Sequence, residues 1–212
     1  MAILRKLKQR LLKKDPYEIA LKESPRGRAL AEFCAEHGIR SFCEIGCNVG
    51  STSKLVAEAL PPSAEMHLFD IQSNIDRTRP LVDQVPDKPK VHYYGNTLKL
   101  RDNYCWTLTN MVKEGKPRFD YVYIDGAHDL TIDALAFFLL DRLLEVGGHI
   151  EFDDYEWTFG SSRTMSSHKW TREWYTPEQI DTPQIGMLVD SLVRTDERYE
   201  EVLKDRVWKK RA

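Results

Sequence analysis

The feature that most constrains the fold is a short apolar run that ends abruptly in polar residues, Phe119-Asp-Tyr-Val-Tyr-Ile-Asp125-Gly-Ala-His128. Its consecutive apolar and aromatic side chains predict a strand that is buried on both faces. The glycine after Asp125 ends the strand pattern. Because ligands bind beyond the carboxyl ends of strands in open parallel sheets, we expect Asp125 and His128 to lie at a functional edge.

The remainder of the chain alternates predicted strands with predicted helices. Strands are expected at residues 41–46, 66–69, 91–94, 121–125 and 149–153, and helices at 24–38, 51–60, 74–85 with an interruption at Pro80, 98–114, 131–144 and 177–193. A closing hairpin is expected at residues 199–202 and 206–209. This alternation predicts an α/β fold built on a doubly wound parallel sheet.

Length and composition exclude several classes of protein. The 212 residues suit one domain with a sizeable core. Lys and Arg number 31 against 33 Asp and Glu, so the net charge of −2 gives no indication of nucleic-acid binding. We expect neither a membrane span nor a secretory signal, because no apolar run is long enough. The four cysteines show no metal-binding spacing, which favours reduced thiols and a cytoplasmic protein.

Residues 1–23 predict an amphipathic, basic N-terminal extension. Within residues 1–14, apolar side chains such as Leu7 and Leu11 fall on one helical face, and lysines and arginines fill the rest. Such a helix packs on its own domain, packs on a second copy in a homo-oligomer, or lies on an anionic membrane surface. We favour packing on protein over a membrane surface, because a lone amphipathic signal is weak.

A glycine-containing loop, Glu44-x-Gly46-x-x-x-Gly50, follows the first predicted strand and precedes a helix. Glycines let the backbone approach a ligand closely, and a helix start has free N–H groups. Asn48 breaks the GxGxxG pattern of dinucleotide-binding proteins. Asp70 ends the next strand, where a carboxylate can accept hydrogen bonds from ribose hydroxyls. The alternatives are a solvated strand end for Glu44 and a helix cap for Asp70.

These motifs, in this order, resemble class I S-adenosylmethionine-dependent methyltransferases over about residues 38–155. The resemblance implies a Rossmann-like sheet of seven strands, mostly parallel with a C-terminal antiparallel strand, in a domain spanning residues 24–212. It also implies that S-adenosyl-L-methionine binds with its methionine part at the glycine loop, its ribose at Asp70 and its adenine near Asn96. The implied cofactor-binding residues are Glu44, Gly46, Cys47, Gly50, Ser51, Asp70, Ile71, Asn96, Asp125 and Gly126.

Acidic residues end two further strands, Asp125 at one and the pair Asp153-Asp154 at the other. Three carboxylates at one edge repel each other unless a positive charge lies between them. Oxygen ligands suit Mg²⁺, and a hydroxyl bound to such an ion loses its proton more easily. Histidine is the side chain most often used as a general base, and His128 suits that role. The alternatives are a helix cap, a solvated strand end and a histidine bonded to backbone.

The run from Ile124 to His128, followed by Gly147-Gly-His-Ile-Glu-Phe-Asp-Asp154, is similar to the macrocin and mycinamicin sugar O-methyltransferases and to the cephalosporin-hydroxylase group. This resemblance implies that His128 is the base and that Asp125, Asp153 and Asp154 are metal ligands. The chain differs from those enzymes in two respects. No auxiliary N-terminal domain is recognisable, and residues 155–177 match no lid of those enzymes, so the resemblance does not identify the substrate.

Residues 155–177 form a long segment without a strand pattern, and we expect a substrate-side loop there. Its aromatic residues either form a stacking wall for an acceptor or cover the edge of the sheet. These residues are Trp157, Trp170, Trp174 and Tyr175. Three cationic residues of the loop, Arg163, His168 and Arg172, either bind an acidic group of the substrate or face solvent.

Together the residues predict an enzyme that transfers a methyl group from S-adenosylmethionine to a hydroxyl of a small-molecule acceptor, such as a sugar or another natural product, with Mg²⁺ assisting. The alternatives are a metal-independent N- or O-methyltransferase and an S-adenosylmethionine-binding protein without methyl transfer. A nicotinamide-dependent oxidoreductase and a nucleic-acid methyltransferase have less support, because the dinucleotide motif and a basic, aromatic track are missing.

Overall fold

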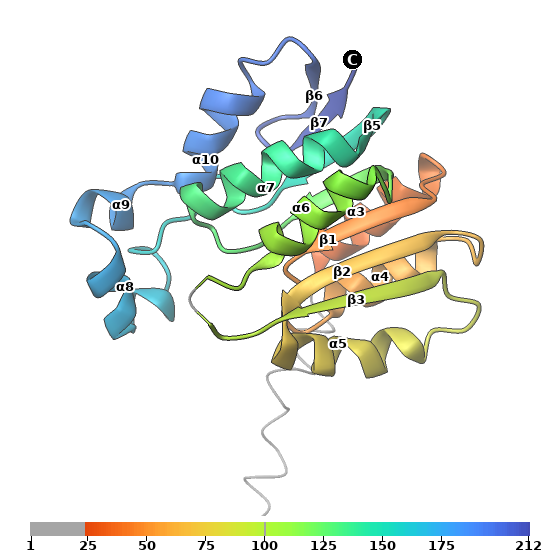
Figure 1. The fold of residues 1–212 in the computed structure, drawn as a ribbon, viewed down its shortest axis with the longest axis horizontal. Coiled ribbons are helices and arrows are strands. Elements are labelled where there is room, and N and C mark those ends of the chain that lie inside the picture. Colours follow the sequence, from red (N-terminus) through yellow and green to blue (C-terminus); the bar gives the residue numbers. More distant parts are fainter. Residues whose placement is uncertain (1–23, 100) are drawn as a thin grey trace, which may run out of the picture.

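The computed structural model describes residues 24–99 and 101–212 (Figure 1). The amphipathic helix predicted within residues 1–14 lies outside this range, so its packing on the domain or on a second copy stays a prediction. Among the described residues, no helix is long and apolar enough to cross a membrane.

One mixed sheet of seven strands forms the centre of the structure. The strands are β1 (Ser41–Ile45), β2 (Glu65–Ile71), β3 (Lys90–Asn96), β4 (Phe119–Ile124), β5 (Leu144–Phe152), β6 (Tyr199–Leu203) and β7 (Val207–Lys210). Their order is β3-β2-β1-β4-β5-β7-β6. The first five strands pair in parallel, and β7 runs antiparallel to both β5 and β6. The predicted α/β sheet, mostly parallel with a C-terminal antiparallel strand, is therefore confirmed.

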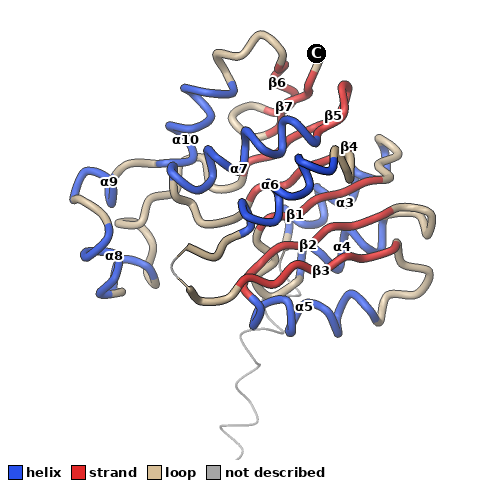
Figure 2. The backbone as a smooth tube through the Cα atoms, in the orientation of Figure 1, coloured by secondary structure: helices blue, strands red, loops and turns tan. Residues whose placement is uncertain are grey.

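Helices cover both faces of this sheet (Figures 1 and 2). One apolar core joins the sheet to α3 (Pro25–Glu36), α4 (Ser51–Ala59) and α5 (Gln72–Asp83). The other core joins it to α6 (Tyr104–Glu114), α7 (Leu130–Leu143) and α10 (Gln184–Leu188). The late segment also contains a 3₁₀ turn (Met165–Ser167), α8 (Lys169–Trp174), α9 (Pro177–Asp181) and a π-helical turn (Val189–Val193).

Local side-chain chemistry explains where the helices begin. The Ser24 hydroxyl accepts a hydrogen bond from the Gly27 N–H at 3.0 Å and caps α3, as its position before a proline predicts. The helix predicted from residue 98 begins only at Tyr104, because Asn103 caps it. The interruption predicted at Pro80 is wrong, since α5 continues through it. The single helix predicted at residues 177–193 is divided at Pro183, which precedes α10.

Backbone hydrogen bonds hold the carboxyl ends of three neighbouring strands at one level. The Asp125 N–H donates to the Ile45 carbonyl at 2.8 Å, which joins the end of β4 to the end of β1. The Asp153 N–H donates to the Ile124 carbonyl at 2.9 Å, which joins the end of β5 to β4. The loops that leave these strands therefore start side by side.

The close approach of β1 and β4 requires glycine at position 46. Gly46 has a φ of +90°, and a Cβ there would overlap the carbonyl oxygen of Asp125. Gly147 has nearly the same φ, +91°, with no atom within 4 Å of a Cβ. We expect Gly147→Ala to lose about 1–2 kcal/mol of unfolding free energy from backbone strain alone. Gly46→Ala should lose a further 1–3 kcal/mol or so from steric overlap.

Urea denaturation of the two variants measures this difference directly. Equal losses in the two variants would mean that the contact between the strand ends does not constrain the fold.

Candidate active site

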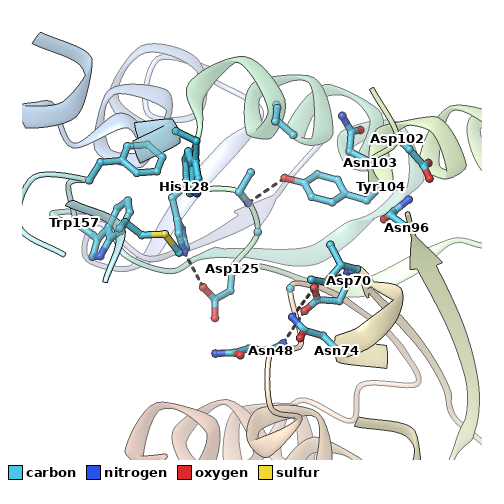
Figure 3. A pocket seen from close by; sticks show the side chains of 18 residues that line it. Asn48, Asp70, Asn74, Asn96, Asp102, Asn103, Tyr104, Asp125, His128 and Trp157 are labelled. Carbon is cyan, nitrogen blue, oxygen red and sulfur yellow. Dashed lines mark hydrogen bonds and ion pairs between the residues drawn. The ribbon is translucent and has the colours of Figure 1, made fainter. Parts of the chain in front are cut away.

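A cavity of about 430 Å³ lies at the carboxyl ends of the parallel strands (Figure 3). Asp70, Asn96 and Asp102 line one part of it, and His128 and Trp157 line the opposite part. The cavity therefore connects the predicted cofactor loop with the predicted catalytic histidine.

The structure separates the predicted cofactor residues into two groups. Those that line the cavity are Gly46, Asp70, Ile71, Asn96, Asp125 and Gly126. Those outside the lining are Glu44, Cys47, Gly50 and Ser51. The second group shapes the loop and the start of α4, and Gly50, at φ +80°, leaves that helix without a side-chain cap.

Asp70 is the anchor of the glycine loop. One carboxylate oxygen accepts hydrogen bonds from the backbone N–H groups of Cys47 at 2.8 Å and Asn48 at 2.7 Å. The other accepts from the N–H of Ile71 at 2.6 Å and from the side-chain amide of Asn74 at 3.0 Å. A carboxylate has about four acceptor positions, so the chain itself uses all of them. A ribose hydroxyl can reach this carboxylate only by sharing or replacing one of these donors.

Glu44 lies beneath the cavity and is 1% exposed. Its carboxylate accepts a hydrogen bond from the Ser53 hydroxyl at 2.6 Å, which ties β1 to α4. Burial, together with the nearby Asp70 carboxylate, raises its pKa to about 8. The solvated strand end considered for Glu44 is wrong, and its side chain contributes to packing beneath the loop.

Asp125, His128 and Asp154 converge at one point. The Nε2 atom of His128 lies 3.6 Å from Asp125 Oδ1 and 3.8 Å from Asp154 Oδ2. One potential ligand atom of each residue lies within 4.8 Å of the others. Burial raises the pKa of Asp125 well above its ordinary value, and the charges of Asp153 and Asp154 raise it further. A cation at this point would relieve the repulsion.

Asp153 has different partners from those predicted. The Arg26 guanidinium contacts its carboxylate, and the Tyr123 hydroxyl donates a hydrogen bond to it at 2.8 Å. Arg26 also lies 3.3 Å from Asp154 Oδ1. Part of the positive charge that these carboxylates require therefore comes from α3. The prediction that Asp153 ligates a metal remains a prediction, and the structure gives its carboxylate a protein cation.

Three residues around the cavity have left-handed backbone angles without being glycine. The φ angles are +48° for Asn48, +54° for His128 and +58° for Asp154. Such conformations cost about 1–3 kcal/mol each and persist where the surrounding structure imposes them, often at functional sites. One strained residue, Asn48, belongs to the cofactor loop. The other two belong to the group of Asp125, His128 and Asp154, here called the acidic cluster.

Buried polar groups hold the loop that carries His128. The Ala127 N–H donates a hydrogen bond to the Tyr104 hydroxyl at 3.2 Å, and this hydroxyl donates to Asp133. On the other side, the Tyr175 hydroxyl donates to Asp129 Oδ2 at 2.6 Å. None of these hydrogen bonds was predicted, because each joins residues far apart in the chain that only tertiary packing brings together. Their effect is to fix the position of the histidine from two sides.

The aromatic wall is present in part. The rings of Trp157 and His128 lie 4.8 Å apart, and Trp170 also lines the cavity. Trp174 is 61% exposed, while Tyr175 packs behind the wall with its ring 4.5 Å from that of Phe159. The cationic residues Arg163, His168 and Arg172 are exposed and lie outside the cavity lining.

Several lining residues have no counterpart among the predicted ones: Asn48, Asn74, Asp102, Asn103, Tyr104, Ala127, Ile132, Phe159 and Met165. The Asp102-Asn103 pair had a usable signal, since Asn103 is a favoured helix cap just beyond the third strand. The others come into place only through tertiary packing.

The raised pKa of Glu44 makes stability depend on pH. Its folded-state pKa of about 8 lies above the ordinary value of 4.5. The contribution of protonated Glu44 to the free energy of unfolding is therefore complete below about pH 4.5 and is lost as the pH rises through 8. Glu44→Gln cannot ionise and should not show this loss. We expect the melting temperature of the variant, relative to that of the wild type, to rise between pH 5 and about pH 8.5.

Thermal unfolding across this pH range tests the assignment, with Glu36→Gln on the exposed end of α3 as the matched control. Parallel pH curves for Glu44→Gln and the wild type would show that Glu44 is ionised in the folded protein.

Comparisons with known proteins place the chain in a family. A family profile described as a methyltransferase domain matches residues 43–155. Comparison with curated protein sequences gives no match. Among solved structures, the fold resembles the O-methyltransferase TomG from Streptomyces achromogenes, involved in tomaymycin synthesis and solved with S-adenosylmethionine. This resemblance has a TM-score of 0.65 and 14% identity, and it covers 100% of this chain and 96% of that one.

The fold also resembles an O-methyltransferase from Bacillus cereus solved with S-adenosylhomocysteine, with a TM-score of 0.60 and 16% identity over 94% of this chain and 88% of that one. A methyltransferase from Podospora anserina, PaMTH1, gives a TM-score of 0.59 and 18% identity, over 92% and 85% of the two chains. These identities support the shared fold alone, whereas the family profile covers more than half of the sequence. The chain therefore belongs to the methyltransferase-domain family.

Proposed function

We propose that this protein transfers a methyl group from S-adenosylmethionine to a hydroxyl group of a small-molecule acceptor, with a divalent metal assisting. The observation that carries the proposal is the single cavity that runs from Asp70 and Asn96 to His128 and Trp157. Membership of the methyltransferase-domain family supports methyl transfer as the reaction class. The similarity to macrocin and mycinamicin sugar O-methyltransferases supports a sugar or another hydroxylated natural product as the acceptor.

The donor end of the cavity suits S-adenosylmethionine, which supplies a methyl group activated by its sulfonium. Gly46 and Gly126 present backbone without side chains to the cavity. The uncapped start of α4 has N–H groups available for a carboxylate such as that of methionine. Asn96 is 8% exposed and lines the same end with an amide that can bond adenine or ribose. Asp70 holds the loop in the conformation that these contacts require.

The acceptor end combines a base with an apolar wall. His128 Nε2 would accept the proton of the acceptor hydroxyl, so that its oxygen could attack the methyl carbon. The carbon–sulfur bond would break as the carbon–oxygen bond forms, and its electron pair would leave with S-adenosylhomocysteine. Asp125 and Asp154 stabilise the imidazolium that results, because each carboxylate lies within 3.8 Å of Nε2. Trp157, together with Phe159 and Trp170, excludes water and provides faces against which a sugar or phenol can stack.

The acidic cluster fits a divalent ion. Asp125 and Asp154 would hold it, since carboxylate oxygens are the ligands that Mg²⁺ prefers. Such an ion makes a bound hydroxyl more acidic. Its charge would also offset the repulsion that raises the pKa of Asp125. Asp153 would join this set only by exchanging its contact with Arg26.

A second candidate, metal-independent methyl transfer, is supported by Arg26. This guanidinium already contacts Asp153 and Asp154, so a protein cation occupies part of the position that an ion would take. In that case His128 acts without a metal.

Isothermal calorimetry of S-adenosylmethionine, with and without Mg²⁺, tests the donor and metal sites together. We expect the wild type to bind the methyl donor and Mg²⁺ to change the binding heat or affinity. Asp154→Asn should retain donor binding and lose the effect of Mg²⁺, because it removes a proposed ligand. Absence of donor binding would overturn the proposed function, and binding that ignores both metal and mutation would favour metal-independent transfer.

Formation of S-adenosylhomocysteine from a panel of hydroxylated sugars and phenols tests the base. His128→Ala should reduce kcat by about 10²–10⁴-fold with little change in donor affinity, because the proton acceptor is lost. The matched control is His168→Ala, an exposed histidine outside the cavity. Full activity of His128→Ala would contradict the role of this residue, and turnover that persists in EDTA would exclude a required metal.

A further inference from the structure

A second group of potential ligands lies on the sheet away from the cavity. It contains Glu65 and His67 of β2 and His92 of β3. His67 and His92 are partners in the parallel ladder, and Glu65 is two residues before His67. Alternate residues of a strand share a face, so the three side chains emerge on the same side of the sheet. Glu65 begins β2 whereas Asp70 lies near its carboxyl end, roughly 16 Å along the strand.

The ligand atoms of this group are close together. Glu65 Oε2 lies 3.4 Å from His92 Nε2 and 3.7 Å from His67 Nε2. All three atoms lie within 4.8 Å of one another. The two imidazole rings are stacked, with centroids 4.4 Å apart and planes 12° from parallel.

Both Nε2 atoms are buried and lack a hydrogen-bond partner among the described residues. His67 as a whole is only 3% exposed. A buried polar atom without a partner costs about 1–3 kcal/mol, and native proteins keep few of them. Two such atoms lie on neighbouring strands, both close to the same carboxylate oxygen, so the three atoms form a set that can bind one cation.

The surrounding groups leave these atoms free to bind. His67 Nδ1 lies 3.1 Å from the Tyr94 hydroxyl, which can accept the Nδ1 proton and leave the Nε2 lone pair available. Lys90 Nζ lies 3.1 Å from Glu65 Oε1, so the lysine engages the other oxygen of the carboxylate. Oε2 therefore faces the two histidines without a competing lysine.

We propose that Glu65, His67 and His92 form a second metal site, one for a divalent ion of the zinc class. Two imidazole nitrogens and one carboxylate oxygen suit zinc, whereas Mg²⁺ prefers oxygen ligands throughout. Zinc bonds of about 2.0–2.2 Å place neighbouring tetrahedral ligands roughly 3.3 Å apart. The distances from Glu65 Oε2 to the two nitrogens are near this value.

Coordination also requires the stacked rings to turn about χ2, a torsion with a broad minimum. The side chains of Glu65 and His92 are 43% and 31% exposed, so the ion reaches the site from solvent. A bound ion links the edge strand β3 to β2. It thereby stabilises the strand that carries Asn96 at its carboxyl end.

Calorimetric titration of the full chain, metal-stripped and without an affinity tag, with ZnCl₂ tests the site. Every sample carries Asp154→Asn, so that the acidic cluster at the cavity does not bind the ion. We expect one equivalent of Zn²⁺ to bind and to raise the melting temperature. Adding His92→Ala should weaken binding at least about tenfold and abolish the rise, because one ligand is lost.

Glu65→Gln is the second test variant, since it keeps the side-chain shape and replaces only the charged oxygen. His168→Ala is the matched control and should bind Zn²⁺ as the Asp154→Asn parent does. MgCl₂ should give no heat at this site. Absence of Zn²⁺ binding in the parent would overturn the proposal. So would Zn²⁺ binding by the His92→Ala and Glu65→Gln variants with the same affinity as the parent.

Discussion

The contact between Gly46 and the carbonyl of Asp125 determines how the rest of the site is built. The ends of β1 and β4 approach so closely that no side chain fits at position 46. The backbone bond from Asp125 to Ile45 fixes the two ends at the same level. As a result, the loop after β1 and the loop that carries His128 leave the sheet side by side and enclose one cavity. The glycine is thus required by strand packing before any ligand is considered.

The carboxylates at this edge repel one another, and the protein reduces this repulsion differently at each residue. Among the described residues Glu44 has no cation beside it, and its raised pKa favours the protonated form. Asp153 is neutralised by Arg26 from a distant helix. The His128 imidazole lies between Asp125 and Asp154, and Arg26 lies 3.3 Å from Asp154 Oδ1. Burial, followed by the charges of the neighbouring carboxylates, raises the pKa of Asp125 well above its ordinary value. An imidazole between two carboxylates is a suitable proton acceptor, and the same two carboxylates remain available to an ion.

Local patterns predicted the sheet and the convergence of Asp125 with His128, because buried strands and the residues that end them have a clear signature. The alternation predicted the parallel part of the sheet, and the resemblance to class I methyltransferases implied seven strands with a C-terminal antiparallel one. The contacts of Arg26, Tyr104 and Asp133 could not be predicted, since each joins segments far apart in the chain. The helix predicted from residue 98 begins at Tyr104 in the structure, because the Asn103 side chain caps it there.

Two residues of β2 differ in how far their polar atoms are hydrogen-bonded, and this difference distinguishes a residue that shapes a site from one that can still bind a ligand. At its carboxyl end, Asp70 has every acceptor position filled by the chain, so its first effect is on the loop that it holds. Toward its amino end, His67 is almost fully buried with one nitrogen unpaired. A satisfied buried group stabilises the structure around it, whereas an unsatisfied one gains free energy only when something binds. By this criterion, Asp70 shapes the loop at one end of the strand, and His67 belongs to the proposed metal site toward the other end.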